Sequence, residues 1–177
     1  MEFLTAVEVE TRSQLVAKTG AEPLSLRTTY PAFIFFPRSS PPPSWVVSLT
    51  RAFADLRVRI DTEAGNRNES DTVLQLLRPS LEHQGFAVES PSKEIPRPVL
   101  FGEGGRMEKE YRIDAYNPAV RLALEVEAGR GAKSNAIYRD LVHMSLIVDA
   151  DYASIAVPLA YRFKSGAKEA IEPAYKK

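Results

Sequence analysis

The chain has 177 residues, of which 44% are hydrophobic and 26% are charged, which are ordinary values for a globular protein and exclude disorder as its main state. Its 23 basic and 23 acidic side chains give a formal net charge of zero, which excludes a polybasic, histone-like protein but is compatible with a local basic face. A chain of this length forms one domain, or one domain with an appendage.

Cysteine is absent, and His83 and His143 are the only histidines. Disulfide scaffolds, zinc ribbons and thiol chemistry are therefore excluded, and a metal site would depend on carboxylates, which suit Mg²⁺, Mn²⁺ or Ca²⁺. Residues Met1–Thr5 lack the basic start and apolar run of a secretory signal. The apolar stretches are far shorter than the ~20 residues that cross a bilayer. We therefore expect a soluble, cytoplasmic protein with no membrane partner.

A proline triplet, Pro41–Pro43, divides the chain unevenly, since six of the 13 prolines precede residue 44. Before the triplet, Phe33–Phe36 is apolar, lies between two prolines and reads as a short strand. We predict a boundary at the triplet. Residues 1–43 would form a strand-like appendage or a dimerisation segment, and residues 44–177 would form the main domain.

Two helices are predicted after the triplet. Ser44 can cap the first helix, in which apolar residues recur at i, i+4 and i+8 on one face: Trp45, Leu49 and Phe53. The second helix begins near Asn68 or Ser70 and ends at Gly85, a residue type that commonly terminates helices. Pro79 lies inside this second helix and is predicted to kink it.

Strands are predicted in the centre of the chain. Residues 86–89 alternate in polarity like a strand, and residues 90–106 form a long loop or irregular strands. Two strands at 110–116 and 120–127 are joined at Asn117-Pro118 as a hairpin.

A last helix and strand complete the order. The helix starts after Ser134 or Asn135, and its core face would consist of Ile137, Leu141, Met144 and Val148. A buried strand at 152–157 ends before Pro158. This order predicts an α/β fold in which helices flank a mixed β-sheet.

Acidic residues cluster on the predicted hairpin. Strand alternation places Glu125 and Glu127 on one face, roughly 7 Å apart, and Asp114 on the neighbouring strand can share that face. Like charges repel, the more so when a helix covers them, and a divalent cation between them would remove that repulsion. Three such carboxylates suit Mg²⁺. The same pattern also describes a strand face that simply meets water, as in a purely structural α/β protein.

The residues around this hairpin resemble the active-site signature of the PD-(D/E)XK nuclease superfamily. The similarity consists of Asp114, a ten-residue gap and then Glu125-Val126-Glu127 at the end of an apolar strand. Glu127 stands where most members have Lys. This departure is similar to that in a subgroup, the type II restriction endonucleases that resemble BglII and BamHI, in which Glu or Gln takes the place of Lys. The helix segment 138–141, Tyr-Arg-Asp-Leu, is similar to that subgroup as well. The resemblance spans about residues 70–158 and implies a restriction-endonuclease-like fold for the main domain.

Carried over by position, the resemblance implies a role for each signature residue. Asp114 and Glu125 would bind Mg²⁺, or Mn²⁺ in its place, and the backbone carbonyl of Val126 would be a further ligand. Glu127 would orient or deprotonate the attacking water. The positive charge of the usual Lys is missing, and a second metal, Arg130 or Lys133 could replace it.

The resemblance also implies contributions from outside the signature. Many members add an acid from the preceding helix, and Glu69 fits the family spacing better than Glu82. Phosphate contacts are expected from the basic C-terminal third of the chain, since Arg, Lys and Tyr commonly supply them. The candidates are Arg130, Lys133, Tyr138, Arg139, Arg162, Lys164 and Lys168.

The implied activity is that of a Mg²⁺-dependent DNA endonuclease, with type II restriction enzymes as one form. Cutting both strands with one site per chain would require a homodimer. The alternative is a catalytically inactive protein of the same fold that acts as a DNA-binding or protein-interaction module. Zero net charge and Glu127 in place of Lys both favour this alternative.

Overall fold

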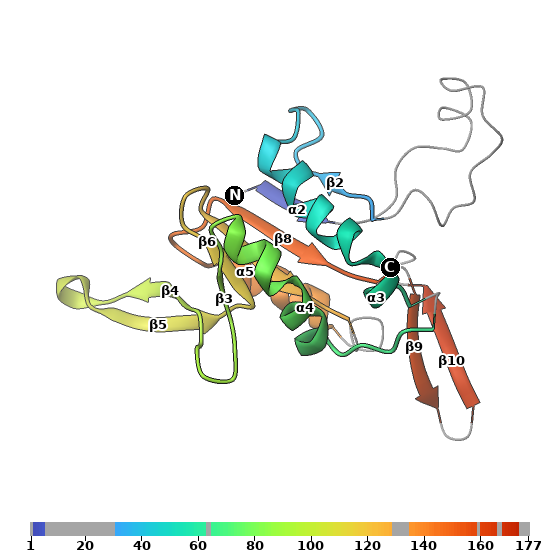
Figure 1. Cartoon of the computed structure of the whole chain (residues 1–177). Helices are drawn as coiled ribbons and strands as arrows, with labels where there is room; N and C mark the ends of the chain where they lie inside the picture. Colours follow the sequence, from blue (N-terminus) through green and yellow to red (C-terminus); the bar gives the residue numbers. More distant parts are fainter. Residues whose placement is uncertain are drawn as a thin grey trace.

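A computed structural model describes residues 2–5, 31–62, 65–128, 135–158, 160–165 and 168–173 (Figure 1). These residues contain both helices and strands, so the chain is of mixed α/β type. The elements are β1 (Glu2–Thr5), β2 (Ile34–Phe35), α2 (Ser44–Asp55), α3 (Arg57–Ile60), α4 (Ser70–His83), β3 (Ala87–Val88), β4 (Pro96–Phe101), η2 (Glu103–Gly105), β5 (Met107–Arg112), β6 (Ala115–Asn117), β7 (Leu122–Val126), α5 (Ala136–Ser145), β8 (Tyr152–Ala156), β9 (Ala160–Ser165) and β10 (Lys168–Pro173).

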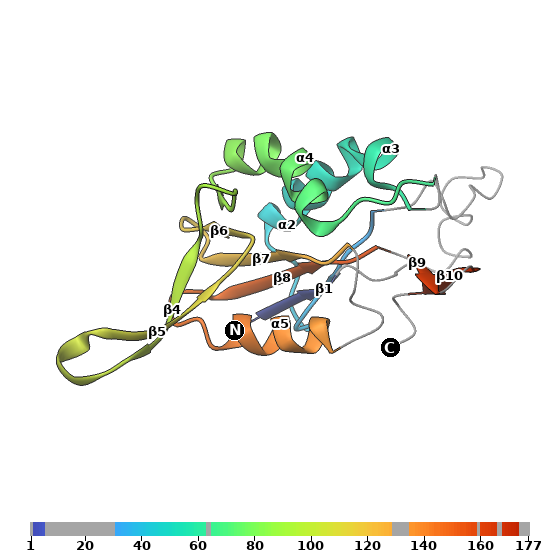
Figure 2. The same ribbon diagram turned by 90° about the horizontal axis from the view of Figure 1, so that it is seen from below.

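Six strands form the central sheet in the order β2-β1-β8-β7-β6-β3. The pairs β1–β8 and β8–β7 are parallel, and the other three pairs are antiparallel. Figure 2 shows α2 and α4 over one face of this sheet and α5 over the other. The predicted mixed sheet flanked by helices is confirmed. None of the helices in the described residues has the length and apolar character needed to cross a bilayer.

The core has two layers because successive side chains of β7 point to opposite faces of the sheet. Leu122 and Leu124 pack in one cluster with Leu77 of α4. Ala123 packs in the second cluster with Met144 of α5. These five side chains are fully buried, and burying each large one contributes roughly 1.5–3 kcal/mol. The sheet is thus covered by packed side chains on both faces.

The predicted first helix is present as α2, but its details differ from the prediction. Pro43 is the N-cap and Ser44 is already helical, so Ser44 is not the cap. The predicted face is shifted by about one residue, and its fully buried members are Val46, Leu49 and Ala52. Trp45 and Phe53 lie at the edge of the same cluster, partly buried.

The other two predicted helices are also present. Helix α4 contains Pro79 and ends before Gly85, whose φ of 88° is the left-handed conformation expected after a helix. Helix α5 ends at Ser145, so the prediction of Val148 on its core face is wrong. Val148 is 53% exposed because it lies in the turn after the helix.

The predicted hairpin is confirmed as β6–β7, in which Ala115 pairs with Leu124. The predicted single strand 110–116 is wrong, because β5 ends at Arg112 and β6 begins at Ala115. β5 pairs instead with β4 as a separate two-stranded ribbon that projects from the body (Figures 1 and 2). Residues 90–106, predicted to form a long loop or irregular strands, belong mostly to this ribbon, whose pairing contains register shifts. The hairpin β9–β10 has no counterpart in the prediction.

The N-terminal strands join the same sheet as the rest of the chain. The strand predicted at 33–36 is present as β2, and Phe35 packs in the cluster that includes Val46 and Leu49. β1 lies between β2 and β8. Strands from both sides of Pro41–Pro43 therefore belong to one sheet.

Candidate functional site

Three acidic residues form a row across neighbouring strands. Ala115 pairs with Leu124 in antiparallel strands. Asp114 precedes Ala115 and Glu125 follows Leu124, so Asp114 lies opposite Glu125. Val88 pairs with Ala115, so Glu89 lies opposite Asp114, and the Glu89 N–H donates to the Asp114 carbonyl at 2.8 Å. Residues directly opposite in antiparallel strands share a face. The sheet itself therefore aligns these carboxylates.

The carboxyl groups of Asp114 and Glu125 are hydrogen-bonded to each other. Asp114 Oδ2 also accepts a hydrogen bond of 2.7 Å from the backbone N–H of Val126. Two carboxyl groups can share a hydrogen bond only when one of them carries a proton. The structure thus brings the two principal predicted ligands together, in an arrangement that needs a positive charge between them.

Burial and neighbouring charges explain the electrostatics of this pair. Burial raises the pKa of Asp114 to about 6, and the charges of Glu89 and Glu127 act in the same direction, against the hydrogen bonds from Val126 and Glu125. Burial also raises the pKa of Glu125 well above its usual range, and the charges of Asp114 and Asp140 raise it further. Strongly raised carboxyl pKa values of this origin are typical of functional sites, although structural networks also produce them.

Glu127 lies close to the pair without joining it in a compact site. Its backbone N–H donates to the carbonyl of Ala156 at 2.9 Å, and its charge raises the pKa of both Asp114 and Glu125. Within the part of the chain that the structure describes, no three His, Cys, Asp or Glu residues are grouped closely enough to hold a metal ion. The geometry therefore offers two carboxylates and not the three that the sequence suggested.

Val126 contributes through its backbone. Its side chain is buried in the core beneath α4, so only main-chain atoms of this residue reach the site. The amide donates to Asp114 and so orients that carboxylate. The role of the Val126 carbonyl as a further ligand stays a prediction.

The two candidate helix acids lie at opposite ends of α4. Glu69 is the N-cap of α4 and is exposed, and Glu82 is exposed in the last turn. The start of α4 does lie beside the end of β7, because the Ala128 N–H donates to Ser70 Oγ at 2.9 Å. Glu69 is thus the closer of the two to the signature in the fold.

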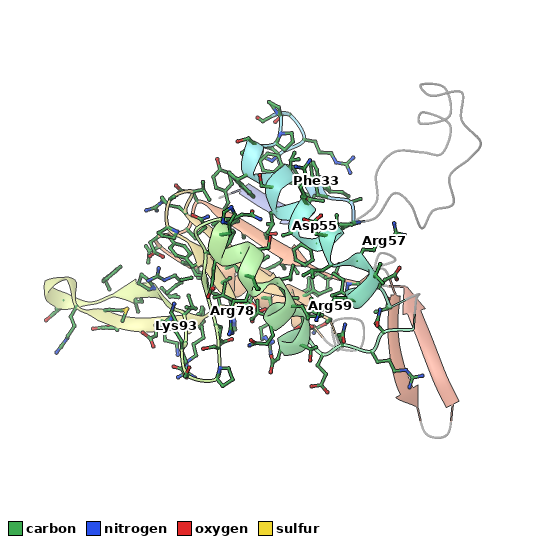
Figure 3. The ribbon with its side chains drawn as sticks, viewed as in Figure 1. Phe33, Asp55, Arg57, Arg59, Arg78 and Lys93 are labelled. Carbon is green, nitrogen blue, oxygen red and sulfur yellow. The ribbon has the colours of Figure 1, made fainter. Side chains whose placement is uncertain are left out.

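Sequence reasoning missed two acids that act on the pair, Glu89 and Asp140. Glu89 is anchored by Arg78 of α4, labelled in Figure 3, whose Nη2 donates to the Glu89 carbonyl at 2.5 Å. Asp140 is 5% exposed on the inner face of α5. A signal for Asp140 was present, because it lies four residues from both Ala136 and Met144, which are buried on the same face.

The predicted DNA-contact residues divide into two groups. Tyr138 and Arg139 lie on α5 with exposed side chains, and Arg139 Nε also forms an ion pair of 3.2 Å with Asp140. Because Asp140 acts on Glu125, this part of α5 lies beside the carboxyl pair. Arg130 and Lys133 lie outside the described residues, and nothing is described of the side chains of Arg162, Lys164 and Lys168.

The donor set fits a Mg²⁺ ion. Mg²⁺ is usually bound through one or two carboxylates, with waters and substrate phosphates completing its coordination, so a third protein carboxylate is not required. Asp114 and Glu125 could supply two hard oxygen ligands, and their buried negative charges would favour a cation between them. Comparisons of the chain with protein-family models, with curated proteins and with solved structures found no match.

Proposed function

We propose that this protein is a Mg²⁺-dependent endodeoxyribonuclease with a restriction-endonuclease-like fold. One observation carries the proposal: Asp114 and Glu125, the residues at the ligand positions of the PD-(D/E)XK signature, meet on neighbouring strands with their carboxyl groups in contact. A solvated acidic strand face would instead leave these side chains apart in water. The mixed sheet with helices on both faces supports the proposal at the level of architecture.

The buried pair explains why a cation would bind. Two ionised carboxylates in contact repel strongly where water is excluded, so either a proton or a metal ion must lie between them. At neutral pH a proton is the weaker competitor for Asp114, whose pKa is about 6. Asp114 and Glu125 could instead hold a divalent cation, which would take the place of that proton and neutralise both groups.

The chain's own residues then have separate tasks in hydrolysis. The Val126 amide orients Asp114. Glu127, whose charge acts on the pair, would orient or deprotonate a water. Tyr138 and Arg139 would contact the DNA backbone from α5. When bound, Mg²⁺ polarises the scissile phosphate and lowers the pKa of a coordinated water. The products would carry 5′-phosphate and 3′-hydroxyl ends, as in the family that the sequence resembles.

Plasmid nicking with Mg²⁺ or Mn²⁺ tests this proposal. We expect Glu125→Gln and Asp114→Asn to lower the rate about 100-fold or more, because each removes part of several kcal/mol of charge stabilisation. Glu82→Gln is the matched control, since Glu82 is exposed at the far end of α4. Binding of Mn²⁺, measured by electron paramagnetic resonance, should fall in the two site variants and not in the control. A wild-type protein that nicks no DNA with either metal contradicts the proposal.

A non-catalytic DNA-binding module is the second candidate. It is favoured by the lack of a three-carboxylate metal group among the described residues and by Glu127 at the usual Lys position. DNA binding measured with Ca²⁺ at several salt concentrations separates the two. Affinity should fall with salt in both cases, since phosphate contacts release counterions, and Arg139→Ala should reduce the slope by about one. Binding without cleavage in Mg²⁺ or Mn²⁺ identifies the module.

A further inference from the structure

Exposed large apolar side chains are concentrated in one region of the described molecule. Of ten such side chains in the described residues, seven lie either on the β4–β5 ribbon or on α5 and the turn that follows it. We call residues 96–112 the arm. The α5 surface consists of Val142, Leu146 and Val148, and Tyr138, one turn earlier, is left to the DNA contact proposed above. On the arm, the exposed apolar side chains are Leu100, Phe101 and Met107.

The outer half of the arm has no packing partner within the described chain. Phe101 pairs with Met107 across the ribbon, yet both side chains are about half exposed, at 49% and 48%. Every residue from 103 to 110 is exposed. An isolated two-stranded hairpin is at best marginally stable in water, since it lacks a third strand or a helix to cover it. The outer arm is therefore without a cover among the described residues.

The base of the arm is fixed on α5 and the residues after it. Tyr111 stacks on His143 with ring centroids 4.1 Å apart, Arg97 pairs with Asp149 at 3.4 Å, and the Val148 N–H donates to the Pro98 carbonyl at 3.0 Å. These contacts direct the rest of the arm away from the body, on the side of the sheet where α5 lies (Figure 2). The α5 surface thus stays uncovered by its own arm.

We infer that the arm packs on the α5 surface of a second copy of this chain, in a two-fold pair in which each arm covers the other copy's helix. A two-fold pair buries both apolar patches at once, because each chain supplies one of each. This inference concerns the surface alone and does not depend on the proposed nuclease activity.

Charge favours a second copy over nucleic acid. Residues 100–110 carry two basic and three acidic side chains, so the outer arm has a net charge of −1 and would not attract the phosphates of DNA. Ten exposed residues of the outer arm and four on or beside the α5 surface, residues 142, 145, 146 and 148, are available to each chain. This is fewer than the roughly 20–30 residues that one side of a standard interface uses, so the pair would have a small interface.

Disulfide trapping tests the contact directly, because the chain contains no cysteine. Phe101→Cys protein is mixed with Val142→Cys protein and oxidised with glutathione disulfide. We expect a covalent heterodimer from this pair. Val47→Cys mixed with Val58→Cys is the control, since both positions are exposed, at 54% and 86%, on other elements. Equal cross-linking in the two mixtures overturns the inference.

Analytical ultracentrifugation of the full chain supplies an independent readout. Wild type should sediment as a dimer at about 100 µM, because a pair with a small interface is weak and forms at high protein concentration. Phe101→Glu should be monomeric with an unchanged circular dichroism spectrum, since the side chain it replaces is exposed. A wild type that stays monomeric, or that shifts only when duplex DNA is added, overturns the inference. Neither readout involves nuclease activity, so each proposal can fail alone.

Discussion

Asp114 lies between two strands, β5 and β6, that pair with different neighbouring strands. Arg112 ends β5, which pairs with the arm strand β4, and Ala115 begins β6, which pairs with β7. The short break at Ile113 and Asp114 carries the chain from the projecting ribbon into the central sheet. At this junction the Asp114 side chain accepts a hydrogen bond from Val126 on the next strand. The site therefore depends on this break between β5 and β6, which positions the Asp114 carboxylate beside that of Glu125.

The raised pKa of Asp114 makes stability depend on pH. The unfolded value is about 4, and the folded value is about 6, so the folded protein holds more protons between these pH values. Stabilisation by the protonated pair is thus present at low pH and is lost as pH rises through about 6. Asp114→Asn keeps an oxygen for the Val126 amide and carries no charge. In metal-free buffer at pH 7.5 it should melt roughly 5–10 °C above wild type.

The matched control for that measurement is Asp55→Asn, because Asp55 is exposed at the end of α2. Its melting temperature should follow that of wild type at every pH. At pH 4 the advantage of Asp114→Asn should largely disappear, since the wild-type pair is then protonated. An Asp114→Asn protein that is less stable than wild type at pH 7.5 shows that the carboxylate is not destabilising in the fold.

Metal addition gives a second prediction at the same residues. A Mg²⁺ ion that binds with a dissociation constant of about 1 mM stabilises the folded state by about 1.4 kcal/mol at 10 mM metal. The melting temperature should rise by roughly 3–5 °C at pH 8 and hardly at pH 5, where protons compete for Asp114 and Glu125. Differential scanning fluorimetry measures both. An equal rise in Glu125→Gln would place the metal elsewhere.

At the scale of elements, each helix is defined by the face that it buries. Helix α2 shows how strongly neighbouring positions differ, because Val46 is fully buried while Val47 is 54% exposed. The buried side chain packs in the cluster that includes Leu49 and Phe35. The apolar residues of the sequence thus fall into inner and outer sets that hydrophobicity alone does not separate.

Val46→Ala and Val47→Ala form a matched pair for this element. Val46→Ala removes two buried methyl groups and should lower the free energy of unfolding by about 2 kcal/mol. Val47→Ala should change it by less than about 0.5 kcal/mol, as is usual for surface positions. Urea denaturation followed by Trp45 fluorescence measures both values. Equal effects would contradict the orientation of α2.

At the scale of the whole molecule, the N-terminal strands complete the sheet. β1 pairs in parallel with β8 over four residue pairs, and β2 pairs with the other side of β1. Phe35 contributes to the core beside α2. Without these strands β8 becomes an unprotected sheet edge, which promotes aggregation.

A truncated chain of residues 44–177 tests this arrangement and the boundary at Pro41–Pro43. We expect the fragment to melt at least 10 °C below the full chain, or to aggregate, because it loses sheet pairing and buried apolar surface. Size-exclusion chromatography and thermal circular dichroism measure these outcomes. A monomeric fragment with an unchanged melting temperature would establish residues 1–43 as an appendage.

Local patterns in the sequence predict the main helices, the central hairpin and the approach of Asp114 to Glu125, although they also predict Glu127 as a third member of that group. Helical spacing located α2, α4 and α5 because an amphipathic helix needs a repeat of 3.6 residues. Alternation and the turn at Asn117-Pro118 located the β6–β7 hairpin. The spacing of Asp114 and Glu125 was sufficient to pair them, since a hairpin register brings residues at a fixed separation together.

Features that depend on contacts between distant segments could not be predicted from local patterns. The insertion of β1 beside β8, the arm, and the approach of Glu89 and Asp140 to the carboxyl pair join segments far apart in the chain. Local periodicity carries no information about which strand pairs with which, or about which carboxylate becomes desolvated. Those outcomes follow from how the layers pack, and burial in that packing raises the pKa of Asp114.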